Sequence, residues 1–157
     1  MIRVEFDDDA VTRALARARA GLDDMTGVMQ DVAEDMLVST QDRMQRGETP
    51  DGAAFAPRSP TTIARYAARG WSYGAPLNRS GEMRQQMATS AGADFAEIGS
   101  NAIQAAVMQF GAAKHSLGPR SPWGDIPARP YLGISERDRS NVADIVETWL
   151  GGLVGED

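Results

Sequence analysis

Residues that could perform chemistry are few and scattered in this sequence. It contains a single histidine, His115, and no cysteine. One histidine cannot make a histidine zinc site, and no carboxylate stands four residues away from it. A Ser-His-Asp arrangement would need a distant serine and a distant acid, and no converging set is visible. We therefore interpret His115 as an ordinary loop residue and expect no enzyme activity, no catalytic residues, no metal and no cofactor.

Two acidic clusters, Asp7–Asp9 and Asp23–Asp24, could be imagined as a metal site or an acid–base pair. A calcium loop needs acids at alternate positions, a central glycine and a terminal glutamate. Consecutive aspartates do not have that spacing. Aspartate is favourable at the start of a helix, because it caps free amides and complements the helix dipole. Helix capping is therefore the simpler interpretation of both clusters.

A third candidate is the stretch 58–84, where arginines are interleaved with aromatic residues: Arg58, Arg65, Tyr66, Arg69, Trp71, Tyr73, Arg79 and Arg84. Such a stretch could bind single-stranded nucleic acid by stacking, or anchor a protein interface, where Arg, Tyr and Trp are favoured. The net charge is −6, and affinity for nucleic acid comes mainly from basic residues. The charge favours a protein interface, and a nucleic-acid-binding module is the alternative.

The elements that position these residues fit one domain spanning 1–157, since domains cluster near roughly 100–150 residues. A composition of 42% hydrophobic and 24% charged residues is typical of a globular chain. No signal peptide is visible, and no window approaches the roughly 20 apolar residues of a membrane span. We expect no membrane association, and the lack of cysteine fits a reducing compartment.

Hydrophobic periodicity predicts an α+β fold with an N-terminal strand and long helices. Residues Ile2–Phe6 alternate as a strand does. A helix follows to about Ala20, where Gly21 is expected to end it, and a second helix with a mainly apolar stripe runs to Gly47. The two helices could also be one long bent helix, because a glycine inside a helix costs only about 1 kcal/mol.

The middle of the chain is rich in proline and glycine and predicts long irregular loops. Residues 48–78 are expected to form a flexible loop with one short helix from Pro60 to Ala68, since proline is tolerated in a first helical turn. Ser80 is expected to cap another short helix that carries Met83 and Met87 on one side. A second loop covers 111–125.

A small antiparallel sheet and a terminal helix complete the predicted fold. Ala93–Ile98 resembles one strand and Ala102–Phe110 a second, with a turn at residues 99–102 between them. Residues 126–134 are apolar but interrupted by two prolines, which suits an edge or an extended packing segment. Ser135 caps a C-terminal helix that is expected to end at Gly151-Gly152.

Five short motifs occur in a fixed order along the chain. They are Pro50-Asp51-Gly52 leading to Phe55-Ala56-Pro57-Arg58-Ser59-Pro60, then Leu77–Met83, Ile98–Asn101, Met108-Gln109-Phe110-Gly111, and Ile126-Pro127-Ala128-Arg129-Pro130-Tyr131-Leu132-Gly133. Together they resemble the phage virion morphogenesis family, which includes tail-completion proteins of P2-like phages and a Mu-like morphogenesis protein. The resemblance covers about residues 1–150. Met108 departs from the family pattern, which has histidine at this position.

The resemblance implies a structural virion protein of a tailed phage or prophage that acts at the head–tail junction, as a tail-completion or neck component. It implies a ring of identical subunits, expected to be a hexamer, in contact with other neck and tail proteins. DNA would only pass through the lumen, and acidic residues such as Asp7–Asp9 and Asp31–Asp35 could line it and repel phosphate. The expected location is the virion neck or tail, with the host cytoplasm during assembly.

The motifs also supply candidate contact residues. In the segment 126–134, two prolines remove backbone donors, and Arg129 carries a planar fork suited to a carboxylate or a row of carbonyls. Packing onto the chain's own core and contact with a neighbouring subunit are both open for this segment. The expected interface residues are Phe55, Pro57, Arg58, Gln109, Phe110, Gly111, Arg129, Pro130, Tyr131 and Leu132.

Overall fold

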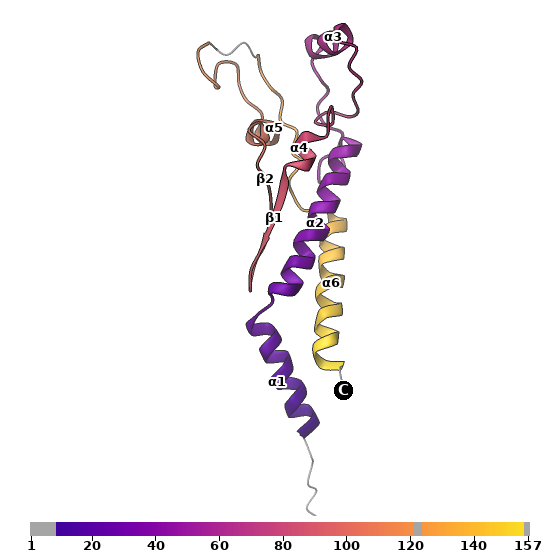
Figure 1. The fold of residues 1–157 in the computed structure, drawn as a ribbon, viewed down its shortest axis with the longest axis vertical. Helices are drawn as coiled ribbons and strands as arrows, with labels where there is room; N and C mark the ends of the chain where they lie inside the picture. The colour runs from indigo at the N-terminus through magenta and orange to yellow at the C-terminus, as the bar shows by residue number, and fades with distance from the viewer. Residues whose placement is uncertain (1–8, 121–123, 156–157) are drawn as a thin grey trace, which may run out of the picture.

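The structure is a computed structural model that describes residues 9–120 and 124–155. Within these residues, helices and one two-stranded antiparallel sheet form an elongated molecule, which confirms the α+β class (Figure 1). The expected strand Ile2–Phe6 lies outside the described residues. In chain order the elements are α1 (Asp9–Asp23), α2 (Thr26–Arg46), α3 (Pro60–Ala68), α4 (Glu82–Gln85), β1 (Met87–Ala91), β2 (Ala96–Ser100), α5 (Ala105–Phe110) and α6 (Glu136–Gly155).

The N-terminal region contains two separate helices. The N-cap of α2 is Met25, which makes no side-chain capping bond, and the preceding Asp24 bonds the first turn instead. The Asp24 carboxylate accepts the Thr26 amide at 3.0 Å and also its hydroxyl. Both bonds lower the pKa of Asp24, and the bond from the Thr26 hydroxyl has the larger effect. At the other end of α2, Gly47 has a φ of 82°, and its amide donates to the Arg43 carbonyl, so it ends the helix as predicted.

Gly21 does not end α1, contrary to the prediction, because it serves close packing instead. A Cβ at this position would lie 2.6 Å from Cδ1 of Leu153 on α6, so glycine lets the two helices approach. The prediction that Gly151-Gly152 ends the last helix is also wrong, since α6 continues to Gly155. Packing of Leu153 against α1 accounts for this continuation, because tertiary contacts outweigh the low helix propensity of glycine.

The sheet is a hairpin, but its strands differ from those predicted. β2 pairs with the preceding β1, in a register that joins Met87 to Ser100 and Ala91 to Ala96. The predicted partner strand, Ala102–Phe110, instead contains helix α5. Ala102, Ala105 and Met108 all pack on the core, and their spacing of three residues is that of a helix turn and not of a strand.

The short helix after Ser80 also differs from the prediction. Its N-cap is Gly81, and the Ser80 hydroxyl donates to the Glu82 carboxylate. Met83 lies on α4 as expected, whereas Met87 begins β1. Both methionines are nevertheless buried in the same core, so their apolar character was interpreted correctly and their secondary structure was not.

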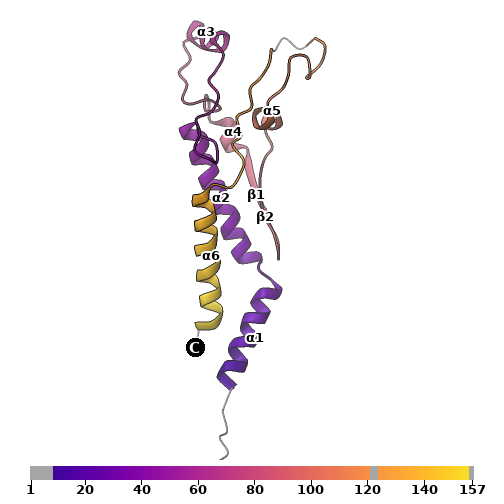
Figure 2. The same cartoon turned by 180° about the vertical axis from the view of Figure 1, so that it is seen from behind.

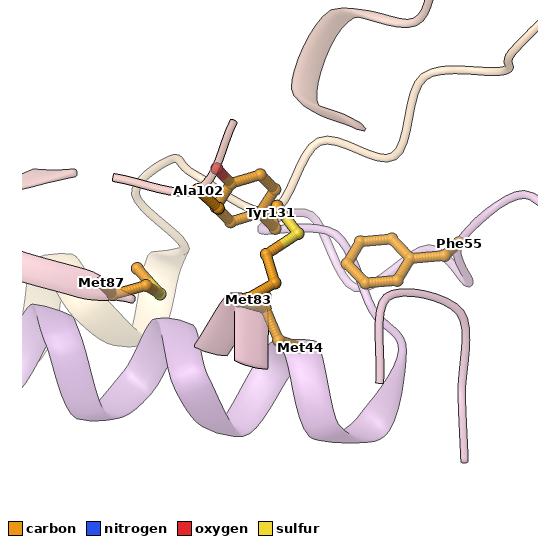
Figure 3. Packing of buried hydrophobic residues seen from close by; sticks show 6 residues of the cluster. All are labelled: Met44, Phe55, Met83, Met87, Ala102 and Tyr131. Atoms are coloured by element: carbon orange, nitrogen blue, oxygen red, sulfur yellow. The ribbon is translucent and has the colours of Figure 1, made fainter. Parts of the chain in front are cut away.

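The core lies where α2, α4 and β1 meet the segment after the second loop. Six buried residues form this cluster, drawn in Figure 3: Met44, Phe55, Met83, Met87, Ala102 and Tyr131. Tyr131 is wholly inaccessible to solvent. It comes from residues 126–134, which form no helix and only one isolated bridge, Ala112 to Ile126. The expectation of an extended packing segment is therefore confirmed, and we call residues 126–134 the closing segment.

Helix α6 lies along α2 and α1 for most of its length (Figure 2). Its start is capped as predicted: the Ser135 hydroxyl accepts the Asp138 amide at 3.1 Å, and the Asp138 carboxylate accepts the Ser135 amide at 2.8 Å. One end of the molecule is therefore formed by α1 and the end of α6. The opposite end carries α3 and the loop that follows α5 (Figure 1).

Candidate assembly surface

Residues 48–78, which we call the arm, leave the end of α2 and return to α4. The Phe55 amide donates to the Gly47 carbonyl at 2.7 Å, which fixes the root of the arm. The helix predicted inside the arm is present as α3, with Ser59 as its cap and Pro60 in its first turn. The arm projects from the body (Figure 1). Its flexibility remains a prediction.

Arg129 holds the arm to the closing segment. Its Nε donates to the Ala56 carbonyl and its Nη2 to the Pro57 carbonyl, each at 2.7 Å. The side chain is buried. Its pKa is lowered, mainly by this burial and to a smaller extent by the positive charge of Arg58. The row of carbonyls that the planar fork suits therefore belongs to the chain itself.

Arg58 closes the arm from the other side. Its Nη1 donates to the Gly74 carbonyl at 2.7 Å and its Nη2 to the Ala75 carbonyl at 2.6 Å. The guanidinium also lies 4.7 Å from the ring centre of Tyr73. Arg58 thus joins the two ends of the projecting part of the arm, so that α3 and its flanking loops form a closed unit.

The prolines of the closing segment keep it from pairing as a strand. Gln109 provides hydrogen bonds in place of a strand partner. Its Oε1 accepts the amides of Tyr131 and Leu132, both at 3.0 Å, and its Nε2 donates to the Leu132 carbonyl at 3.0 Å. Buried backbone groups must be paired. One side-chain amide therefore replaces a strand partner and fixes Tyr131 in the core.

Gly111 follows directly and has a φ of 75°. A Cβ here would lie 2.8 Å from both the Ala128 nitrogen and the Ile126 oxygen, so no other residue fits without displacing the closing segment. Phe110, immediately before it, points outward with 79% of its surface exposed. Phe110 does not contact the core, because Gln109 and Gly111 occupy the contact with the closing segment.

The ten expected interface residues are thus placed at very different depths. Three are buried within the chain and support the surface from below: Phe55, Arg129 and Tyr131. Four are partly buried: Arg58, Gln109, Gly111 and Leu132. Pro57, Phe110 and Pro130 are exposed and available to a neighbour. A contact between subunits remains a prediction for these residues.

A groove of about 860 Å³ lies between the arm and the closing segment. Apolar side chains and several hydroxyls line it, and its charged residues are four arginines and two acids: Arg58, Arg65, Arg79, Arg129, Glu82 and Asp125. We call it the basic groove. Positive charge therefore gathers at the loop end of a chain whose net charge is −6.

The sequence did not reveal a buried ion pair that ties α2 to the start of α6. Arg43 Nη1 lies 2.6 Å from Asp138 Oδ2, and the two side chains are 5% and 0% exposed. The guanidinium also donates to Ser39, Thr40 and the Gly133 carbonyl. Arg43 falls on the apolar stripe of α2 beside Thr40 and Met44, and a charged residue at such a position is a signal for a buried partner.

The arm also contains the sequence Gly70-Trp71-Ser72-Tyr73-Gly74, which has the G-x-S-x-G spacing of a hydrolase nucleophile. In hydrolases this turn joins a strand to a helix. Here it follows α3 and lies in irregular chain. His115 is exposed in the other loop with a φ of 67°. Among residues 9–120 and 124–155, no group of three acids, histidines or cysteines could hold a metal ion.

Replacing Arg129 by lysine should loosen the arm. Lysine keeps the charge but cannot donate to two carbonyls in a fixed fork, so we expect a loss of about 1–3 kcal/mol in the free energy of unfolding. Hydrogen exchange at the Phe55 amide should become faster. Denaturant unfolding and exchange followed by NMR would measure both. Arg19→Lys on the exposed face of α1 is the matched control, and an equal loss there would contradict the role of Arg129.

No helix in the described part of the chain is long and apolar enough to cross a membrane. No solved structure matches the chain. A curated relative, the putative capsid assembly protein G of Escherichia phage Mu, is 31% identical over 137 residues, which cover 83% of this chain and 86% of that protein. The sequence profile of the phage virion morphogenesis family matches residues 6–151, a span that contains every motif described above. The chain therefore belongs to the phage virion morphogenesis family.

Proposed function

We propose that this virion assembly protein is a non-enzymatic component of the head–tail junction. In this proposal it acts through protein contacts as a tail-completion or neck subunit. Copies associate in a ring, which we expect to be a hexamer, and the ring contacts other neck and tail proteins while DNA passes through its lumen. Membership of the family and similarity to a phage Mu protein named for capsid assembly support a structural role in virion assembly.

The observation that carries this proposal is the excess surface of the single chain. Its accessible area is 10737 Å². A compact monomer of 16.9 kDa is expected to expose about 7,700 Å². The chain thus exposes more surface than a compact monomer of its mass, as a subunit that packs against neighbours does. An isolated subunit with so much surface is suited to contacts with neighbours.

Apolar side chains support the same proposal at both ends of the molecule. Near the loop end, Ile103 is 99% exposed and Phe110 is 79% exposed. At the other end, α1 exposes Val11, Leu15 and Leu22, which lie on one face because they are spaced four and seven residues apart. Apolar side chains that gather on an exposed face mark sites of contact with other proteins.

The alternative, a nucleic-acid-binding module in the stretch 58–84, gains little from the geometry. Stacking of bases requires accessible aromatic faces. The guanidinium carbons of Arg69 and Arg79 lie 4.8 Å and 4.7 Å from the ring centre of Trp71, and Arg58 lies against Tyr73. The aromatic faces are thus engaged by the chain's own arginines, and the cluster is better suited to stiffening the arm.

Replacing Phe110 by alanine tests the proposal in a phage that lacks the gene and is supplied with the variant. Because the ring of Phe110 is exposed, stability should change by about 0.5 kcal/mol or less. Finished particles should fall by roughly tenfold or more, as expected for an aromatic interface anchor. Electron microscopy should then show separate heads and tails. Phe95→Ala, at the tip of the hairpin, is the matched control.

Two results would oppose the proposal. Normal particle yield with Phe110→Ala and with Ile103→Ala would show that the loop end is not part of the assembly surface. Complete particles from a phage without the gene would remove the role at the head–tail junction. Light scattering tests self-association separately, since a ring has a mass that is a defined multiple of 16.9 kDa.

A further inference from the structure

We infer that the basic groove of one copy binds the exposed acidic face of α2 on the next copy, so that subunits join head to tail. This inference rests on the proposed function, because it assigns the surfaces through which a ring would close. It names a different pair of surfaces from Phe110 and Ile103, and its test can therefore fail independently.

The basic groove combines positive charge with an apolar floor. Among its charged lining residues, arginines outnumber acids by four to two. The floor includes Leu77, Met83 and Met108, which belong to the core or pack against it. A groove of this kind fits a ridge of acids that also carries an apolar side chain.

Two arginines of the groove are held in place by uncharged partners. Arg58 and Arg129 donate to backbone carbonyls, which carry no net charge. Arg79 lies over Trp71. Arg58 and Arg129 are close enough that the charge of one lowers the pKa of the other, so a bound anion would relieve their repulsion. Arg58 and Arg129 are thus fixed in position by partners that do not neutralise their charges.

The acidic face of α2 has the complementary character. Asp31, Glu34, Val38 and Asp42 are spaced by three, four and four residues, so they lie along one face of the helix. All four are exposed, and Val38 is 58% exposed between its acidic neighbours. The other faces of α2 are covered by α6 and by the hairpin. We call these four residues the acidic ridge.

Charge decides how two copies can meet through these surfaces. Two grooves would repel each other, and so would two acidic ridges. A groove against a ridge is attractive, and such a contact uses different patches on the two subunits. Contacts of this heterologous type generate closed rings when the rotation between subunits closes. The inference assigns Asp31 and Glu34 to the subunit contact, and so removes them from the expected lining of the lumen.

Charge reversal tests the contact in a phage without the gene that is supplied with each variant. Arg65→Glu with Arg79→Glu reverses the groove, and Asp31→Arg with Glu34→Arg reverses the ridge. Each double variant should lower the titre of infectious particles by roughly tenfold or more, because like charges then face each other. Circular dichroism and thermal unfolding establish that each variant folds.

Restoration of the contact is the decisive result. A chain that carries all four substitutions presents a reversed groove to a reversed ridge, so the titre should recover. Supplying the two double variants together should also restore it, because each then finds a complementary partner. Light scattering of the purified chains should show that the combined variant self-associates more than either double variant does.

Three outcomes would overturn the inference and leave the role at the head–tail junction standing. The first is a normal titre with either double variant. The second is a combined variant that stays as defective as its parents. The third is loss of duplex DNA binding in the groove variant, without recovery in the combined variant, which would assign the groove to nucleic acid. If a reversed variant fails to fold, Arg65→Gln with Arg79→Gln replaces it, and its self-association must depend less on salt than that of the wild type.

Discussion

Replacing Arg43 by methionine is expected to lower the free energy of unfolding by about 3–5 kcal/mol. Asp138 is fully buried, and its carboxylate lies 2.6 Å from the Arg43 guanidinium. Removal of the cation leaves this carboxylate without its charge partner inside the protein, and an uncompensated buried charge is costly. Urea unfolding followed by circular dichroism would measure the loss. The same pair joins α2 to the start of α6, so the effect should be global.

A double-mutant cycle separates the pair from its surroundings. Asp138→Asn alone should cost a similar amount, and the double variant should cost clearly less than the sum of the two. The exposed pair of Arg46 and Glu48, with side chains 51% and 40% exposed, is the matched control. Arg46→Met should cost below about 1 kcal/mol. Additive losses in the cycle would show that the two side chains contribute independently.

The dependence of stability on pH identifies the charge on Asp138. Burial acts to raise the pKa of this carboxyl, but hydrogen bonds from Ser39 and Ser135, together with the charge of Arg43, outweigh it and lower the pKa. The unfolded chain therefore binds protons more readily than the folded one. The stabilisation is present above about pH 4, the ordinary range for aspartate, and is lost as the pH falls below it. Asp138→Asn should weaken this acid sensitivity.

The elements that the sequence predicted well are those with local signals. α3 begins at Pro60 and ends at Ala68 as expected, because Ser59 and Pro60 form a start signal that needs no tertiary contact. The hairpin was misassigned because the segment from Ala102 to Phe110 is too short and apolar to tell a strand from a helix by pattern. Its structure depends on three side chains that reach a core built by distant residues.

The candidate surface shows the same division. The motif residues Gln109, Gly111 and Arg129 make specific contacts within the chain, and their expected contact with a neighbouring subunit remains a prediction. Whether such a residue faces inward or outward could not be read from the sequence, because burial depends on elements far away in the chain. Arg129 was expected at an interface, and its partners proved to be carbonyls about 72 residues earlier. The pairing of Asp138 with Arg43 could not be predicted for the same reason, because the two residues are 95 positions apart in the sequence.

Replacing Tyr131 by alanine should cost about 3–5 kcal/mol, as for other large aromatic residues removed from a core. The ring is wholly buried among Met44, Met83 and Ala102 (Figure 3). Its loss leaves a cavity that the closing segment cannot fill, since Gln109 and Gly111 fix the backbone on either side of the contact. Thermal or denaturant unfolding would measure the loss. Phe110→Ala removes an aromatic ring from a neighbouring motif but should leave stability nearly unchanged.

Tyr131→Phe separates the ring from its hydroxyl. Burial raises the pKa of the Tyr131 hydroxyl, so the folded chain holds this proton more tightly than the unfolded chain does. The corresponding stability is present below about pH 10 and is lost as the pH rises through the raised pKa. Phenylalanine should keep most of the stability at neutral pH and reduce the loss at alkaline pH. If Tyr131→Ala proved as stable as Phe110→Ala, the closing segment could not be the part of the core that holds the loop end in place.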